Sequence, residues 1–350
     1  MIDISRANLE LISLNKVGNK AKGENNIISP DLFYPNDEEK NELLVHFLVP
    51  FKNLAEVNRF CHSSDIEYNE VYSFCCKIFK KNKEFLKYSS SIIKHLYEQS
   101  DHPNIKSGEV SLVYFHDIIF EGQLSSAIGI YKSERKESFF QFKKSGGGLV
   151  LATQKGIASK KLDKACLIIN IEEEDGLRVL SLDNNNYDTE YWKYKFLQIE
   201  EIQDFNFQTR SYISLCKNFS NDVVERQEGK KESISFLNQS MKYLSNNESL
   251  EEEEFIQTVF DNKEIRQQFI NYKKQYEENY DVILHDEFEI SKSVLHTQKR
   301  KVKNQINLDT QIQIKLGFNE EIASDQYIER GFDESKKMFF YKIFFNKELE

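Results

Sequence analysis

The sequence predicts an α+β protein, in which helices and antiparallel strands occupy different stretches of the chain. Before Gly108, apolar residues mostly recur at helical spacing; beyond it they follow the shorter period of strands, which turn residues separate. Strands that follow one another after a run of helices favour an antiparallel sheet. From Asn206 the helical spacing returns, so we expect a mixed helix and antiparallel-sheet N-terminal domain and a smaller helical C-terminal domain ending in a β-hairpin.

The N-terminal elements are predicted from apolar spacing and from turn residues. Leu9–Lys16 alternates like a short strand and runs into a turn at Gly18-Asn19. Asp37 is a suitable N-cap for a helix over Asp37–Phe47. Further helices are expected over Leu54–Phe60, Glu67–Lys80 and Lys83–Gln99.

The central part of the chain is predicted to form the sheet. Its strands are expected at Glu109–Phe120, Ala127–Lys132, Ser138–Lys143, Leu149–Gln154, Lys164–Glu172 and Leu177–Leu182. The stretch Lys143–Gly148, KKSGGG, lacks the GxxxxGK[ST] spacing of a phosphate-binding loop and precedes a strand instead of a helix. A hairpin tip is therefore favoured for it.

A polar, charged stretch separates the two predicted domains. The domains are 1–220 and 233–350, with a linker over 221–232. The first domain is expected to end with a helix over Asn206–Phe219, and the second to contain helices at Ser233–Leu244, Leu250–Gln275 and Ser291–Lys303. A strand is expected over Ile306–Leu316, and Met338–Phe345 closes the chain as a second strand after a turn at Arg330–Asp333.

Composition narrows the class of protein. The 350-residue chain has a formal net charge of −10, so any contact with nucleic acid must come from a local basic surface. Its five cysteines show no metal-binding spacing, and reduced thiols in a cytoplasm are the simplest interpretation. No apolar window approaches the length of a membrane span, so a cytoplasmic protein without a membrane partner is expected.

A series of short motifs runs through nearly the whole chain. The best is Leu162–Gly176, LDKACLIINIEEEDG; others are His46–Lys52, Lys94–Glu98 with His102-Pro103, Ala127–Glu134, Tyr191-Trp192, Leu215–Phe219, Tyr272–Lys274, Asp286–Lys292 and Gly331–Glu334. In this order they resemble the bacterial nucleoid-associated protein family, the roughly 37-kilodalton class. The resemblance implies association with the nucleoid and no enzymatic activity, and it offers no catalytic residues to carry over. The stretch Lys143–Gly148 is not part of it.

One basic segment is the strongest physical candidate for contact with DNA. It carries Lys292, Lys299, Arg300, Lys301 and Lys303 with no intervening carboxylate, while Val294, Leu295 and Val302 are expected to face the core. Neutralising about five phosphates would give a salt slope of roughly −4 to −5, enough for weak binding without sequence specificity. The alternative is a solvated helix face that pairs with the acidic residues of Asp286–Glu289.

A second basic region lies between Lys132 and Lys164, with nine lysines or arginines against three acids. If its strands and loops share a face, it could follow a phosphate backbone by charge alone. Its candidate contacts are Lys143, Lys144, Lys155, Lys160, Lys161 and Lys164. The alternative is a set of surface lysines that alternate between two faces.

Other chemistries find no support in the sequence. The seven histidines show no HExxH spacing, no GxSxG motif exists, and Glu172–Gly176 lacks the spaced oxygen ligands of a calcium loop. We therefore expect no catalytic residues, no metal and no cofactor. The leading hypothesis is a non-enzymatic nucleoid-associated protein that contacts DNA weakly. The main alternative is an adaptor that other chromosome-associated proteins recruit, and a phosphate-handling enzyme is a distant third.

Overall fold

The computed structural model describes residues 2–52, 54, 56–157, 162–184, 190–301, 305–316 and 327–347. It confirms the predicted α+β class, because helices and antiparallel strands occupy largely separate stretches of the chain. The chain divides into two compact units, Met1–Ile202 and Gln203–Glu350, each with hydrophobic clusters of its own.

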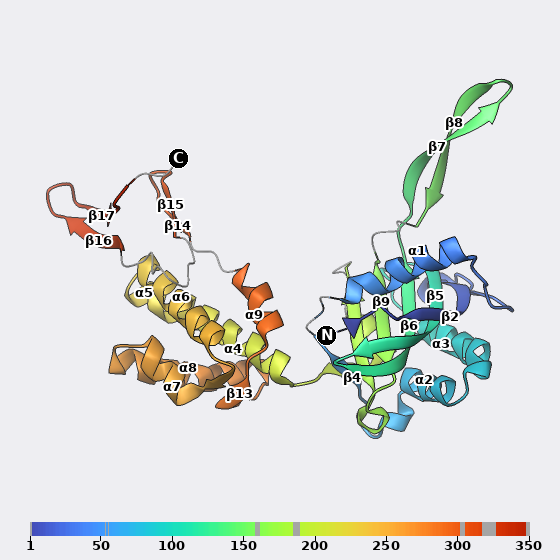
Figure 1. Cartoon of the computed structure of the whole chain (residues 1–350), viewed down its shortest axis with the longest axis horizontal. Helices are drawn as coiled ribbons and strands as arrows, with labels where there is room; N and C mark the ends of the chain where they lie inside the picture. The colour runs from blue at the N-terminus through green and yellow to red at the C-terminus, as the bar shows by residue number, and fades with distance from the viewer. Residues whose placement is uncertain are drawn as a thin grey trace. The chain divides into compact units, whose positions relative to one another are not determined.

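An antiparallel sheet forms the centre of the first unit (Figure 1). Within the described residues it has nine strands, in the order β11-β4-β10-β9-β6-β5-β2-β3, and β1 pairs with β5. The strands are β1 (Ile2–Asp3), β2 (Asn8–Val17), β3 (Ile27–Ile28), β4 (Asn58–Phe60), β5 (Gly108–Phe120), β6 (Gln123–Ser133), β9 (Lys164–Ile169), β10 (Arg178–Asp183) and β11 (Ile199–Glu201).

Both faces of this sheet are covered. Every residue of β9 is buried, with Cys166 and Ile168 in one apolar cluster and Leu167 and Ile169 in the other. The first cluster lies under α2 (Glu70–Lys80), α3 (Phe85–Gln99) and the π-helical segment η6 (Glu190–Leu197), and the second lies under α1 (Asp37–Leu48). A strand covered on both faces needs apolar residues throughout, which explains the unbroken apolar run in its sequence.

Two predictions near the N-terminus need correction. The N-cap of α1 is Asn36, not Asp37, and it forms a reciprocal capping box with Glu39. Part of Leu54–Phe60, predicted as a helix, is strand β4, which pairs with both β10 and β11. Its partners lie more than a hundred positions away, so no local pattern reveals the pairing. Short 3-10 turns complete the unit at η1 (Lys20–Lys22), η2 (Val49–Phe51), η3 (Ile66–Tyr68), η4 (Asn82–Glu84) and η5 (Glu173–Asp175).

A two-stranded hairpin extends from the first unit and pairs only with itself. It consists of β7 (Glu137–Ser145) and β8 (Gly148–Gly156), and we call Glu137–Gly156 the arm. Gly146 and Gly147 form its tip and have positive φ angles, as a tight hairpin turn requires. The prediction of a hairpin tip over Lys143–Gly148 is therefore confirmed. Figure 1 shows the arm in green, standing clear of the sheet.

The boundary between the two units lies earlier than the sequence suggests. It falls between Ile202 and Gln203, before α4 (Phe205–Phe219), and the predicted linker over 221–232 is largely helical within the second unit. The buried side of α4, including Tyr212 and Phe219, packs into the core of the second unit, which is why the helix belongs there.

The second unit is a helical bundle with small two-stranded sheets. Phe219 lies at its centre, with its ring against those of Phe236, Phe260 and Phe269. Its elements are η7 (Ser220–Val224), α5 (Glu225–Gln227), α6 (Lys230–Asn246), β12 (Ser249–Glu251), α7 (Glu252–Val259), α8 (Lys263–Tyr280), β13 (Glu287–Glu289), α9 (Lys292–Lys299), β14 (Gln305–Asn307), β15 (Gln313–Lys315), β16 (Ile328–Asp333) and β17 (Met338–Ile343).

Three predicted elements of this unit are divided differently in the structure. The helix predicted over Leu250–Gln275 is β12 followed by α7 and α8, because Asn262 caps a new helix after Asp261. The strand predicted over Ile306–Leu316 is the hairpin of β14 and β15. The turn predicted at Arg330–Asp333 is part of β16, which pairs with β17 to form the expected terminal hairpin.

Candidate nucleic-acid interface

Helix α9 positions the first group of candidate residues. Ser291 caps its N-terminus by accepting a hydrogen bond from the Val294 amide, and Val294 and Leu295 are buried as the sequence indicates. With these apolar side chains against the unit's core, the polar side of the helix faces solvent. The helix ends at Lys299, so its basic residues gather at its C-terminus, where cations interact favourably with the helix dipole.

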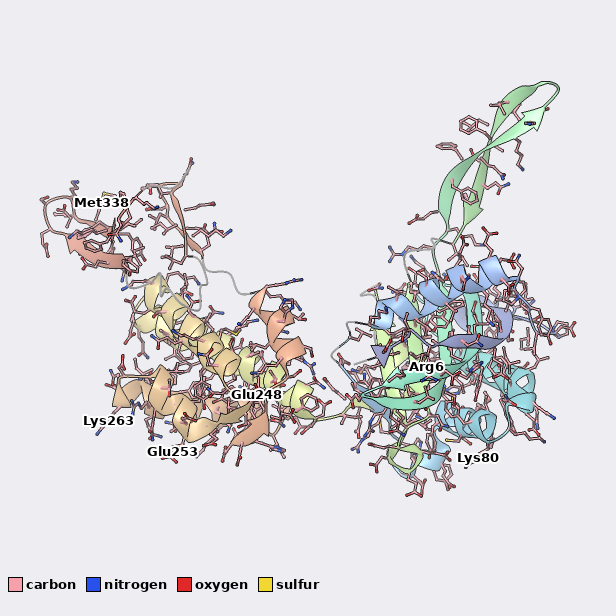
Figure 2. All side chains as sticks on the ribbon, in the orientation of Figure 1. Arg6, Lys80, Glu248, Glu253, Lys263 and Met338 are labelled. Carbon is pink, nitrogen blue, oxygen red and sulfur yellow. The ribbon has the colours of Figure 1, made fainter. Side chains whose placement is uncertain are left out.

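Lys292 lies at the other end of α9 and has an internal role. Its Nζ donates hydrogen bonds to the backbone oxygens of Ser245, at 3.3 Å, and Asn247. It also lies 3.6 Å from a carboxylate oxygen of Glu248, which is labelled in Figure 2. Because these oxygens terminate α6, Lys292 caps that helix and is less available to a phosphate than the residues at the far end of α9.

A group of cations at the C-terminal end of α9 is the more exposed part of this surface. Arg300 and Lys301 are exposed, Lys299 is half-buried, and no carboxylate partner of Arg300 or Lys301 occurs among the described residues. Lys217 of α4 lies beside them, donating a 3.0 Å hydrogen bond to the Gln298 side chain. Its burial and the Lys301 ammonium lower the pKa of Lys217. Lys303 lies outside the described residues.

Lys217 is the member of this group that sequence reasoning missed. It is separated from Lys301 by more than eighty positions, and only the packing of α4 against α9 brings the two together. The Lys301 ammonium lies close enough to Lys217 to contribute to the lowering of its pKa, so the two cations are neighbours. We call Lys217, Lys299, Arg300 and Lys301 the basic end of α9.

The second basic region is divided by the fold. Lys143, Lys144 and Lys155 are exposed on the arm, and none of the three has an ion-pair partner within the part of the chain that the structure describes. Lys144 and Lys155 lie on one face of the ribbon and Lys143 on the other, as the strand register requires. Lys160 and Lys161 lie outside the described residues.

Lys164 does not belong to a surface. Its side chain is 1% exposed and forms an ion pair with Asp183 on the neighbouring strand. Directly opposite it on β6, Lys132 is also buried and donates to Glu134 at 2.8 Å and to the Tyr191 hydroxyl at 2.9 Å. Burial lowers the pKa of Lys132, and the Glu134 carboxylate partly offsets this. A lysine buried in this way is not available to DNA, so the prediction for Lys164 is corrected.

The acidic residues near α9 have other partners. Asp286 accepts from the buried Lys273 at 2.7 Å, and Glu252 pairs with the same lysine. The sequence alternative pairs the acids of Asp286–Glu289 with the basic residues of α9, but Asp286 pairs with Lys273 of α8, and Lys292 lies beside Glu248. The other two acids of that stretch, Glu287 and Glu289, are exposed to solvent.

The comparisons with known proteins give the family. The family described as nucleoid-associated protein YejK matches residues 14–337, which is most of the chain. This chain belongs to that family. No curated protein matches the chain at the threshold applied.

The motifs that resemble the nucleoid-associated family meet in the core of the first unit. Lys132 and Glu134 come from Ala127–Glu134, Lys164 from Leu162–Gly176, and Tyr191 from η6. The Nζ atoms of both lysines lie 5.3 Å from the centre of the Tyr191 ring, so three motifs contribute to one buried ionic cluster. These residues of the family motifs therefore hold η6 against the sheet.

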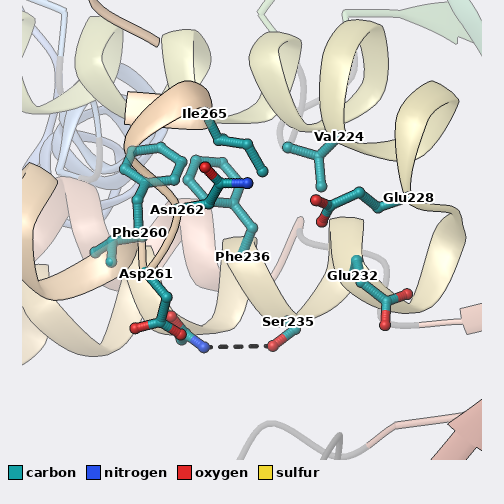
Figure 3. A pocket seen from close by; sticks show the side chains of 11 residues that line it. Val224, Glu228, Glu232, Ser235, Phe236, Phe260, Asp261, Asn262 and Ile265 are labelled. Atoms are coloured by element: carbon teal, nitrogen blue, oxygen red, sulfur yellow. Dashed lines mark hydrogen bonds between the residues drawn. The ribbon is translucent and has the colours of Figure 1, made fainter. Parts of the chain in front are cut away.

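Figure 3 shows a cavity of the second unit with an acidic rim. It measures about 230 Å³ between η7, α6 and the start of α8, and Phe236 and Phe260, stacked at 5.0 Å, line it. Glu228, Glu232 and Asp261 lie around it.

No group of three or more metal-ligating side chains with suitable geometry occurs in the described part of the chain. None of the helices described there is long and apolar enough to cross a membrane.

Proposed function

We propose that this protein is a non-enzymatic nucleoid-associated protein that acts in the cytoplasm and binds DNA weakly, without sequence specificity, through the basic end of α9. Family membership supports the association with the nucleoid. The grouping of Lys217, Lys299, Arg300 and Lys301 on one side of the second unit supports direct contact with phosphates.

The chemistry of this surface favours the phosphate backbone over the bases. Three of its four groups are lysine ammonium ions, which contact phosphates as point charges, and only Arg300 carries the paired donors that can read a guanine edge. With a net charge of −10, the rest of the protein repels DNA, so binding depends on local charge and on salt.

The test is a titration of labelled duplex DNA at several salt concentrations. We compare the wild type with Lys299→Ala/Arg300→Ala/Lys301→Ala. If each cation neutralises one phosphate, the slope of log K against log salt becomes shallower by roughly 2 to 3 in the variant. The affinity at low salt falls with it, and unrelated duplex sequences behave alike.

A matched control removes the same charge elsewhere in the second unit. Lys242, Lys263 and Lys274 are exposed, and Lys263 is labelled in Figure 2. Their replacement by alanine should leave the salt slope unchanged. Wild-type protein that fails to bind DNA at low salt refutes direct contact, and equal effects of the two triple variants refute the assignment to α9.

A second candidate function is an adaptor that reaches the nucleoid through a protein partner. The observation that favours it is an exposed aromatic pair on the β16–β17 hairpin, where Phe332 and Phe339 lie opposite each other with their rings 5.0 Å apart. Exposed aromatic side chains in one patch are typical of protein-binding surfaces. An adaptor predicts nucleoid association that persists when the α9 cations are removed and is lost when these aromatics are replaced by serine.

A further inference from the structure

The arm exposes apolar side chains that a soluble protein normally covers. Phe140 and Phe142 are 70% and 71% exposed, and Leu149 and Leu151 lie beside them on the same face of the ribbon. In Figure 2 the side chains of the arm stand away from the rest of the first unit. An isolated two-stranded hairpin is at best marginally stable in water, so this face is expected to be buried against a further surface.

The charge of the arm narrows the choice of that surface. Its strands carry three lysines and one carboxylate, Glu137, at the base. The most apolar face has Lys144 near the tip and Lys155 near the base, so two such faces packed against each other in a two-fold arrangement would bring lysines together. The arm therefore fits an apolar surface with an acidic rim better than it fits a second arm.

The first unit has such a surface. A cavity of about 390 Å³ opens between α1 and the sheet, and its apolar lining includes Leu14, Phe33, Leu43 and Phe47. Glu39 and Glu42 lie at its edge, and α1 as a whole carries four carboxylates against one lysine. Leu14, Phe33 and the nearby Ile157 are also substantially exposed, so the cavity continues an apolar patch.

The position of the arm's base indicates that the cavity receives the arm of a second copy of the chain, and not its own arm. Ser133, the last residue of β6, and Ile157, the first after β8, both line this cavity. The arm thus begins at the rim of its own cavity and extends away, leaving the cavity open. A two-fold axis near this rim would place each arm over the cavity of the other copy, and both contacts would form at once in a closed dimer.

We propose that two copies of this chain exchange their arms, each β7–β8 ribbon lying along α1 and over the adjoining cavity of the other copy. The arm is long enough for this contact, because nine residues of strand reach about 30 Å and the twelve residues of α1 span about 18 Å. Lys144, on the same face as the two phenylalanines, then lies among the carboxylates of α1, and Phe140 and Phe142 enter the apolar lining.

The surface available is sufficient for a stable dimer. A fully buried aromatic side chain covers about 150–250 Å², so Phe140 and Phe142, 70% and 71% exposed, offer roughly 200–350 Å² of further burial in one arm. Two exchanged arms, together with Leu149, Leu151 and the receiving surfaces, reach the ~1,600 Å² of a standard interface. The proposed exchange of arms is independent of the proposed DNA binding, because its first test measures only the mass of the protein in solution.

The first test measures the mass of the full-length protein by sedimentation across the micromolar range. The wild type is expected to be a dimer, and Phe140→Ser/Phe142→Ser to raise the dimer dissociation constant by at least about tenfold, since central aromatics dominate such interfaces. Both residues are exposed, so the variant should fold. Phe340→Ser/Phe345→Ser, which removes two exposed aromatics outside the arm, is the matched control and should remain a dimer.

The second test exchanges charges between the arm and its receptor. Glu42→Lys opposes the Lys144 of each arm to a lysine, and Lys144→Glu opposes a glutamate on each arm to Glu42, so each variant alone should be largely monomeric. In the mixed dimer both arm contacts pair opposite charges, so mixing the two variants should restore the dimer as a heterodimer.

Several outcomes would overturn the exchange. A monomeric wild type would do so, as would a dimer that persists in both charge variants. If mixing fails to restore the dimer although each variant is folded and monomeric, the arm does not meet α1. If the arm variants lose DNA binding and keep the wild-type mass, the ribbon binds nucleic acid instead. A small molecule found in the cavity of the wild type would also overturn the exchange, because it would exclude the arm.

Discussion

At the scale of single residues, the structure separates lysines that look alike in the sequence. Lys155 and Lys164 both belong to one basic region, yet the first is exposed on the arm and the second is buried beside Asp183. A buried lysine is tolerated only when an acid compensates its charge, and Asp183 does so across two strands. Asp183 lies outside the basic region Lys132–Lys164, so the spacing of residues within that region does not distinguish Lys155 from Lys164.

Replacement of Lys164 by methionine is expected to destabilise the protein by about 3–5 kcal/mol, because it leaves the Asp183 carboxylate buried without its partner. The free energy of unfolding in urea measures this. Lys155→Met, on the exposed arm, should change it by about 0.5 kcal/mol or less. Replacing both members of the pair, as in Lys164→Met/Asp183→Leu, should recover most of the loss; an equally unstable double variant would show that the ion pair is not the cause.

A buried thiol predicts a loss of stability at high pH. Burial, reinforced by the Glu173 carboxylate, raises the pKa of Cys76 to about 11, above the ordinary value of 9.0. Below pH 9 the thiol is protonated in both states. Between pH 9 and 11 the unfolded chain loses the proton and the folded chain keeps it, so the free energy of unfolding falls with pH by up to about 1.4 kcal/mol per unit from this group.

Urea unfolding at a series of pH values measures this dependence. Cys76→Ala is expected to have a smaller slope between pH 9 and 11 than the wild type, although it is less stable at neutral pH. Parallel pH profiles for the two proteins would contradict the assignment of the slope to Cys76.

At the scale of elements, the turn between β9 and β10 shows how a sequence motif specifies geometry. The acidic stretch Glu172–Gly176 closes the hairpin as predicted, through the 3-10 turn η5. Gly176 has a φ of 96°, and its carbonyl accepts a 2.9 Å hydrogen bond from Phe60 on β4. The acidic residues and the glycine predict a turn in the sequence, but nothing in the sequence predicts that β4 packs against it.

Gly176→Ala is expected to cost at least about 2 kcal/mol, because an added Cβ would lie 2.5 Å from the Phe60 carbonyl oxygen at a φ that side chains disfavour. Thermal unfolding measures the change. Gly147→Ala is the matched control: its φ is 85°, but open space surrounds the position, so only the smaller backbone strain applies. Equal losses in the two variants would mean that the contact with Phe60 is unimportant.

At the scale of the whole molecule, the residues of the apolar clusters do not cross the boundary at Ile202–Gln203. The two clusters of the sheet lie within Met1–Ile202, and those of the helical unit lie within Gln203–Glu350. Each unit therefore buries its own apolar surface. The sequence indicated two domains but placed α4 with the first, because the charged stretch after the helix resembles a linker more than the short segment before it.

We expect residues 1–202 and 203–350 to fold when they are expressed separately, since each retains its complete core. Circular dichroism and cooperative urea unfolding of the two fragments test this. Fragments divided at residue 220 are the control: the first would carry α4 without its partners, and the second would lack Phe219. If the division at 220 gives the more stable pair, the boundary lies after α4.

The sequence by itself determined the α+β class, the family and most helices and strands, because apolar periodicity, caps and turn residues act over a few neighbouring positions. It also showed that any DNA contact must be local, since the net charge is −10. Only the tertiary structure decided which cations are available. It buried Lys164, assigned Lys292 to the end of α6, and brought Lys217 to the end of α9. Burial and charge pairing join residues far apart in the chain, and no local pattern records them.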